Sequence, residues 1–164
     1  YLSRHYRVSK AIRMLPHRHL FISTVVGIGG WVLCKDVRAI PASVASGTLA
    51  DLDHCADYAW YGLFGEHRLL LPLHGYEWAL PLFLWSRKRW GNRMAWIITI
   101  SYLVHLLADQ VENQTKPLGY FFLYRLSKRF LLREISRSPV DGENGRLEDI
   151  EKLKHLSRRL RFWN

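Results

Sequence analysis

Two long stretches of apolar residues dominate the pattern of hydrophobic and polar positions along this chain. They run from Leu20 to Leu33 and from Met94 to Leu107, and each is about fourteen residues long. The first predicts a helix over about 17–33, and the second predicts one over about 93–111. A membrane-spanning helix needs about 20 apolar residues, so both lengths favour buried helices over spanning ones.

Further helices are expected between these stretches. Pro41 can open a helix that continues through Ala50, and a second helix should run from His74 to about Trp90. The segment 55–73 is irregular and predicts a mixture of short helix and loop. No stretch alternates apolar and polar residues with a period of two, and no Gly-rich phosphate loop is present. The sequence therefore predicts an all-α fold, a compact bundle of several helices.

An aromatic and basic segment follows the second apolar stretch. Residues 118–133 read LGYFFLYRLSKRFLLR, with cations at Arg125, Lys128, Arg129 and Arg133. This composition is typical of a helix that lies in a membrane interface, where the cations meet anionic headgroups and the aromatic rings enter the boundary. An ordinary amphipathic helix docked on the protein's own core has the same pattern, and the sequence leaves both interpretations open.

The C-terminal part of the chain is strongly polar. Residues 138–145, SPVDGENG, have the composition of a surface linker. Beyond them, residues 146–161 predict a highly charged helix with a narrow apolar stripe, suited to peripheral packing or to a partner. We therefore expect a helical domain over 1–137, a linker over 138–145 and a charged C-terminal helix over 146–164.

The charge of the chain points to an anionic partner. The formal net charge is +10 over 164 residues, and 49% of the residues are hydrophobic, including seven tryptophans. Phosphate esters, an acidic lipid surface and nucleic acid all meet the charge criterion. The chain has no nucleic-acid recognition motif, and its richness in Trp and Leu favours lipid. We expect an anionic membrane surface and a phosphate-bearing small molecule or lipid as partners, and no nucleic acid.

The two cysteines suggest neither a zinc knuckle nor a disulfide framework. Cys34 and Cys55 lie twenty-one positions apart and form no Cys-x-x-Cys pair. A chain with two cysteines and no expected disulfide framework suits a reducing compartment.

Histidines and acidic residues recur together in apolar surroundings. Three segments carry them: Asp51-Leu52-Asp53-His54, His74-Gly75-Tyr76-Glu77 and His105-Leu106-Leu107-Ala108-Asp109. Residues three or four apart project from one helix face, so His74 with Glu77, and His105 with Asp109, could each grip one ion. Imidazole with carboxylate suits zinc, and more carboxylate also suits manganese or iron. The sequence predicts a metal site between helices.

Each of these residues also has a simpler interpretation. Asp51 or Asp53 could cap a helix, His54 could lie in an exposed loop, and His74 could be a hydrogen-bonded core residue. The conjunction favours a metal site, because Asp109 follows an apolar stretch directly and a buried carboxylate costs several kcal/mol unless it is paired or coordinates a metal.

One histidine of the first helix completes the candidate ligands. His17 and His19 compete for this position. His19 is favoured because it lies closer to the apolar face if Leu20, Val26 and Leu33 turn toward the core.

Over residues 17–130 the pattern resembles the YdjM-like family of membrane-bound metal-dependent hydrolases, which is related in architecture to zinc-dependent phospholipase C. Members of that family show an early His, then Gly-x-Leu-Pro-Asp-x-Asp-His, then a His-Arg-Gly-x-Thr-His-Ser-like segment and finally His-x-Leu-Leu-Asp. The counterparts here are His19, the segments 47–54 and 105–109, and His74-Gly75. In this chain Ala50 replaces the proline, and residues 75–79 lack the second imidazole of the third segment.

The resemblance implies a membrane-associated metal-dependent hydrolase at the cytoplasmic face of a bacterial inner membrane, acting on a phosphoester or phospholipid-like substrate. Zn²⁺, or alternatively Mn²⁺ or Fe, would be held by the candidate ligands His19, Asp51, His54, His74, His105 and Asp109. Asp53 or Glu77 would act as the base, and Glu77 could instead replace the missing imidazole as a ligand. The alternative is a non-catalytic binding or assembly subunit of a membrane complex, with a structural or degenerate metal site.

Overall fold

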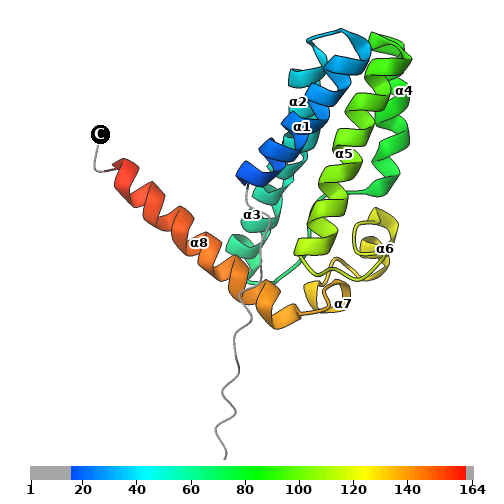
Figure 1. Cartoon of the computed structure of the whole chain (residues 1–164). Coiled ribbons are helices and arrows are strands. Elements are labelled where there is room, and N and C mark those ends of the chain that lie inside the picture. Colours follow the sequence, from blue (N-terminus) through cyan, green and yellow to red (C-terminus); the bar gives the residue numbers. More distant parts are fainter. Residues whose placement is uncertain (1–15, 162–164) are drawn as a thin grey trace, which may run out of the picture.

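The fold is a bundle of long helices with shorter helices at one end. The computed structural model describes residues 16–161, which contain helices, turns, loops and two isolated bridges but no strand. Four helices lie side by side: α1 (Pro16–Cys34), α2 (Ala39–Thr48), α4 (Ala79–Trp90) and α5 (Asn92–Glu112) (Figure 1). The all-α prediction is confirmed, and the two apolar stretches form α1 and α5.

Shorter elements lead away from this bundle. The 3₁₀ helix η1 (Leu49–Asp53) and α3 (His54–Phe64) continue the chain from α2, and the 3₁₀ helix η2 (Tyr76–Trp78) precedes α4. After α5 come α6 (Phe122–Ser127), α7 (Leu132–Ile135) and α8 (Pro139–Arg161). In Figure 1, α6 and α7 lie at the lower end of the bundle, and α8 extends away from it.

Small residues line the interior of the bundle. The buried positions of α1 recur every three or four residues, at His19, Ser23, Gly27 and Gly30. The Ser43 hydroxyl of α2 donates to the Ser23 carbonyl at 2.7 Å, and Ser101 of α5 donates to the Ser43 carbonyl at 2.8 Å. A Cβ atom at Gly47 would lie 2.0 Å from the Ser23 Oγ. Close approach and hydroxyl bonds therefore join these three helices.

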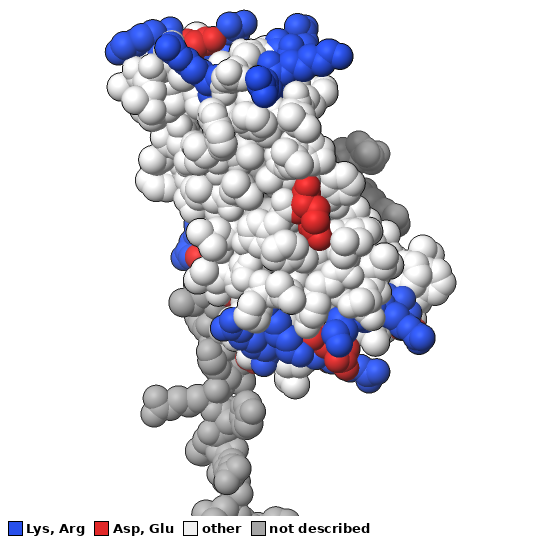
Figure 2. Space-filling view, turned by 90° about the vertical axis from the view of Figure 1, so that its right-hand side faces the viewer, with Lys and Arg blue, Asp and Glu red and all other residues white. Residues whose placement is uncertain are grey.

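The outward faces of the bundle are apolar. Among the exposed large side chains of α1, α4 and α5 are Leu20, Phe21, Val25, Ile28, Val32, Leu33, Leu80, Leu84, Trp85, Trp96, Ile100, Leu107 and Val111. Figure 2 shows the face that carries α4 and α5, where Lys and Arg gather at both ends and a wide band between them is uncharged apart from an acidic patch. The α1–α2 and α4–α5 junctions lie at the upper end in Figure 1, and the cations beside them are Lys35, Arg38, Arg87, Lys88, Arg89 and Arg93.

One helix among the described residues is long and apolar enough to cross a membrane. It is α5, with 21 residues, and 56% of its most apolar window is buried inside the protein. A core helix of a soluble protein has the same length and composition, so α5 by itself does not distinguish the two settings.

The segment 118–133 is not one helix. Arg129 and Phe130 have φ values of 52° and 58°, in the left-handed region, and their turn separates α6 from α7. Arg125, expected to face lipid headgroups, is fully buried and donates to the His74 carbonyl. The expectation of one continuous helix over 118–133 is therefore wrong, because the left-handed turn interrupts it, whereas a membrane contact of this segment stays a prediction.

Two other expected boundaries differ as well. Helix α4 begins at Ala79 rather than at His74, and Pro81 falls in its first turn, where a missing N–H is tolerated. Residues 139–145, expected in a linker, form the first turns of α8, because Pro139 and Asp141 suit a helix N-terminus.

Candidate metal centre

All six candidate ligands lie together at one end of the bundle. They come from α1, η1, α3, the loop before η2 and α5, and they are His19, Asp51, His54, His74, His105 and Asp109. His19, His74, His105 and Asp109 are at most 2% exposed, whereas Asp51 and His54 are partly exposed. The structure thus brings together segments that lie far apart in the sequence, and the resulting buried His/Asp cluster could hold a metal ion.

The cluster divides into two overlapping groups of four residues. One group is His19, Asp51, His105 and Asp109, and the other is Asp51, His54, His74 and Asp109; within each, one donor atom per residue lies within 4.8 Å of the others. Asp51 and Asp109 belong to both groups. A carboxylate has two oxygens, so these two residues could bridge a pair of cations.

The distances between donor atoms suit ligation. Two donors that are each about 2.1 Å from one tetrahedral zinc ion lie about 3.4 Å apart. Asp109 Oδ1 lies 3.0 Å from His19 Nε2, and Asp109 Oδ2 lies 3.2 Å from His74 Nε2 and 3.6 Å from His105 Nε2. Asp51 Oδ1 lies 3.5 Å from His74 Nε2, 3.6 Å from His105 Nε2 and 3.8 Å from His54 Nε2. These separations run from 3.0 to 3.8 Å, and the distance of about 3.4 Å between two ligands of a tetrahedral zinc ion lies within this range.

The Nε2 atoms of His74 and His105 lie 3.0 Å apart in the buried interior. A neutral imidazole whose Nδ1 carries the proton has a lone pair on Nε2, so two such rings would face each other with lone pairs. A cation between them resolves that conflict.

Asp53 holds His74 from the opposite side. Its Oδ1 lies 2.8 Å from His74 Nδ1, and its Oδ2 accepts the backbone N–H of Leu73 at 2.7 Å. A carboxylate on Nδ1 orients the ring and directs the lone pair of Nε2 toward the metal position. Asp53, predicted as a catalytic base, is thus placed where it positions a ligand.

The carboxylates around His74 favour its charged form. Burial alone would lower the pKa of the imidazole, but its hydrogen bonds to carboxylates, that with Asp109 first among them, raise the pKa well above its ordinary value. The carboxylates therefore favour a proton on His74 when no metal is bound, whereas burial lowers the pKa of His105 to about 4 and favours its neutral form.

Glu77 does not join either group of candidate ligands. Its Oε1 accepts the backbone N–H of Leu123 at 3.3 Å, and its Oε2 is buried without a hydrogen-bond partner among the described residues. His74 precedes η2 and Glu77 lies within it, so the two residues do not share the helix face that their spacing suggested. The notion of an i,i+3 ligand pair depended on a helix that is absent at His74.

Sequence reasoning did not identify Arg125 as part of the centre. Burial lowers the pKa of its guanidinium, while Tyr120, Asp53 and Glu77 oppose this shift. Its bond to the His74 carbonyl attaches α6 to the loop that carries a candidate ligand. The available signal was a lone arginine within the aromatic run FFLYRL, a segment that the sequence could place either on a lipid surface or on the protein's own core.

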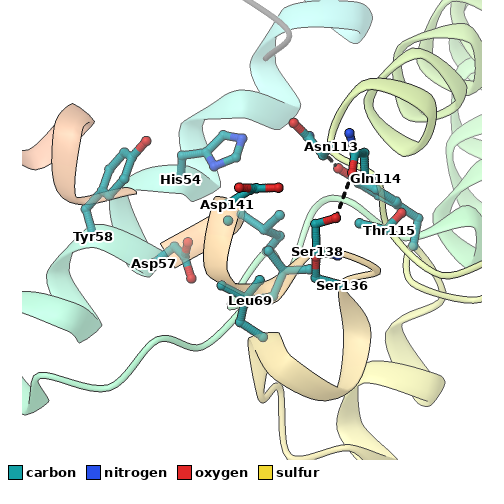
Figure 3. A pocket seen from close by; sticks show the side chains of 14 residues that line it. His54, Asp57, Tyr58, Leu69, Asn113, Gln114, Thr115, Ser136, Ser138 and Asp141 are labelled. Carbon is teal, nitrogen blue, oxygen red and sulfur yellow. Dashed lines mark hydrogen bonds between the residues drawn. The ribbon is translucent and has the colours of Figure 1, made fainter. Parts of the chain in front are cut away.

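A pocket of about 130 Å³ adjoins the centre. His54 belongs both to the candidate ligands and to the pocket lining, so the pocket borders the cluster at this residue, and Figure 3 shows His54 beside lining residues of α3 and α8.

Comparisons with models of protein families, with curated proteins and with solved structures find no match to this chain.

Proposed function

We propose that this protein is a membrane-embedded, metal-dependent hydrolase. The observation that carries the proposal is the convergence of four imidazoles and two carboxylates, drawn from separate elements, at donor separations that suit ligation. A structural role would be served by a closed site of four ligands. This cluster offers more donors than one such site needs, and a pocket borders it.

A divalent cation at these donors supplies a Lewis acid and lowers the pKa of its water toward about 7. Residues of the chain would bind the cation, orient its ligands and exchange a proton with the substrate. Asp51 and Asp109 are the shared carboxylates, and Asp53 orients His74. If the other five residues hold the metal, His54, which has the longest contact in the cluster and lines the pocket, is placed to exchange a proton with a substrate.

The ligand set favours zinc, with manganese and iron as alternatives. Neutral imidazole nitrogen and carboxylate oxygen are both common zinc ligands, and a cluster with shared carboxylates also suits manganese or iron. Phosphoesters are the proposed substrate class, in accord with the basic charge of the chain and with the family that its motifs resemble.

The arrangement of the bundle supports membrane embedding. In α1, a hydroxyl and two glycines face inward and large apolar side chains face outward, which is the reverse of a helix in a water-soluble bundle. Between Leu20 and Cys34 no residue is charged, and the 19 residues of α1 and 21 of α5 span about 28 to 32 Å, close to the thickness of a bilayer's hydrocarbon core. Lys and Arg gather at both ends of the bundle, where the headgroups of an embedding bilayer would lie.

The test combines metal analysis with turnover. Protein purified in detergent without chelator should contain one or two equivalents of zinc, manganese or iron, and should hydrolyse at least one member of a panel of phosphomonoesters, phosphodiesters and phospholipids. Removal of the metal should abolish turnover, and adding zinc back should restore it. Protein that contains no metal, or that holds metal but cleaves none of the panel, would overturn the hydrolase proposal.

The second outcome would favour a different function. A chain that holds metal without turnover would fit an assembly subunit of a membrane complex. The observation in favour is α8, which is anchored by its first turn and then extends away from the bundle in Figure 1.

A further inference from the structure

The pocket beside His54 is enclosed by several elements of the fold and has a floor of core residues. Its wall is formed by α3, by the connection after α5, by the segment around α7 and by the first turn of α8. At its floor lies a small core cluster formed by Leu69, Leu71, Leu132 and Ile135, and three of these residues line the pocket. Its wall thus joins segments from well-separated parts of the chain.

The lining contains a buried polar atom without a partner. Thr115 is 4% exposed, and its Oγ1 has no hydrogen-bond partner among the described residues. Nearby, the Ser138 hydroxyl donates to Gln114 Oε1 at 2.9 Å, and the Asn113 amide donates to the Tyr120 hydroxyl at 2.9 Å. A buried hydroxyl left unpaired next to a cavity is satisfied when a ligand occupies that cavity.

The charge of the lining is negative. Asp141 of α8 points into the space between His54 and Ser138 (Figure 3), and Asp57 also lines the pocket. None of the described lining residues is Lys or Arg, although the whole chain is strongly basic. Carboxylates and oxygen acceptors attract hydrogen-bond donors and repel a second anionic group.

The volume limits what can enter. Since one water occupies about 30 Å³ in the liquid, about 130 Å³ accommodates a group of a few heavy atoms. Hydroxyl-bearing or ammonium-bearing alcohols of two or three carbons have this size.

We propose that this pocket binds the alcohol part of the substrate ester, a small group bearing an ammonium or hydroxyl donor, through the carboxylate of Asp141 and the hydroxyl of Thr115. The inference rests on the proposed function, because it places the phosphoryl group at the candidate metal centre and the alcohol beyond His54. The basic surface of the chain would then attract an anionic lipid or phosphate, and the acidic pocket would select the alcohol that is esterified to that phosphate.

Equilibrium binding to the zinc-loaded protein tests the proposal with two esters that differ by one ammonium group. O-phosphoethanolamine should bind at least about tenfold more tightly than ethyl phosphate, the scale expected for one charge-assisted hydrogen bond. Asp141→Asn should remove this preference and leave the affinity for ethyl phosphate unchanged. Glu143→Gln is the matched control, since it removes a carboxylate from the same helix outside the pocket lining, and it should keep the preference.

Equal affinity of the wild-type protein for the two esters would overturn the proposal, and so would a preference that survives in Asp141→Asn. The wild-type comparison decides the matter even if the variant does not fold. A protein that shows the preference and its loss in Asp141→Asn, yet cleaves no ester, would support the pocket assignment while rejecting the hydrolase.

Discussion

At the scale of single residues, the centre depends on two carboxylates that serve several imidazoles at once. Asp109 contacts His19, His74 and His105, and Asp51 contacts three of the four candidate imidazoles. Loss of a shared ligand therefore weakens both groups, whereas loss of one imidazole weakens one.

Asp109→Asn should lower the affinity for zinc by at least about 100-fold, because it removes a charge from both ligand groups while it keeps the shape of the side chain. Metal content after dialysis against a weak chelator measures the effect. Asp36→Asn is the control, since this exposed loop residue pairs with Arg38 at the opposite end of α1 and should leave metal content unchanged. An Asp109→Asn protein that retains all its metal would exclude Asp109 as a ligand.

The raised pKa of His74 predicts an unusual dependence of stability on pH. Its folded pKa lies above the unfolded value of about 6.5, so the stabilisation is fully present below that value and is lost as pH rises through the folded pKa. Metal-free protein should therefore have a lower melting temperature at pH 9 than at pH 7. Saturating zinc should reverse this trend, because a metal ligand must be deprotonated. A flat melting profile of the metal-free protein between these pH values would contradict the role of the carboxylates around His74.

At the scale of elements, the packing of α1, α2 and α5 combines small residues of α1 and α2 with buried apolar side chains of α5 such as Met94, Ile97 and Ile98. Ser23, Ser43 and Ser101 form a relay of hydroxyl-to-carbonyl bonds across the three helices. His19 and Ser23 lie on the same stripe of α1, so the spacing between helices also sets the position of a candidate ligand.

Gly47→Ala and Gly29→Ala make the same change at a tight and at an open position. The new Cβ at position 47 would overlap the Ser23 hydroxyl, so we expect a loss of about 1 to 3 kcal/mol of stability. At position 29 nothing lies within 4 Å, and alanine should gain up to about 1 kcal/mol through helix propensity. Thermal melts in detergent compare the two variants. Similar melting temperatures would mean that close approach at Gly47 is unimportant.

At the scale of the whole molecule, the exposed apolar side chains of the bundle lie between two ends at which Lys and Arg gather. The proposed membrane embedding rests on the exposed apolar side chains of the bundle together with the cations at both of its ends, which would meet the two headgroup regions of a bilayer. Trp31 and Trp90 lie near the C-terminal ends of α1 and α4 and are 43% and 42% exposed, which suits interfacial tryptophans. We infer embedding of the bundle itself, whereas the sequence left open whether the segment 118–133 lies on a membrane surface or packs on the protein's own core.

Membrane fractionation distinguishes the two modes. An embedded bundle should stay in the membrane pellet through washes with high salt and with alkaline carbonate, and it should be released only by detergent. A protein held at the surface by cations would be released by salt, because exposed electrostatic attraction is screened. Release of most of the chain by either wash would reject embedding.

The sequence alone determined the properties that depend on neighbours along the chain. Apolar stretches with helical period predicted α1 and α5, since one turn of helix involves only residues a few positions apart. The same local reasoning identified all six residues of the cluster, because imidazoles and carboxylates are conspicuous in apolar surroundings. Metal binding by this cluster stays a prediction, and so does the division into domains.

Only the tertiary structure decided where those residues face. It assigned Asp53 to the far side of His74, removed Glu77 from the candidate ligands and placed Arg125 in the interior. Periodicity shows that a helix has an apolar and a polar face, but it does not show whether the apolar face meets other helices or the surroundings. In α1 the small and polar face lies inside, because hydroxyls and glycines permit close contact with α2, and the large apolar side chains are consequently left outside.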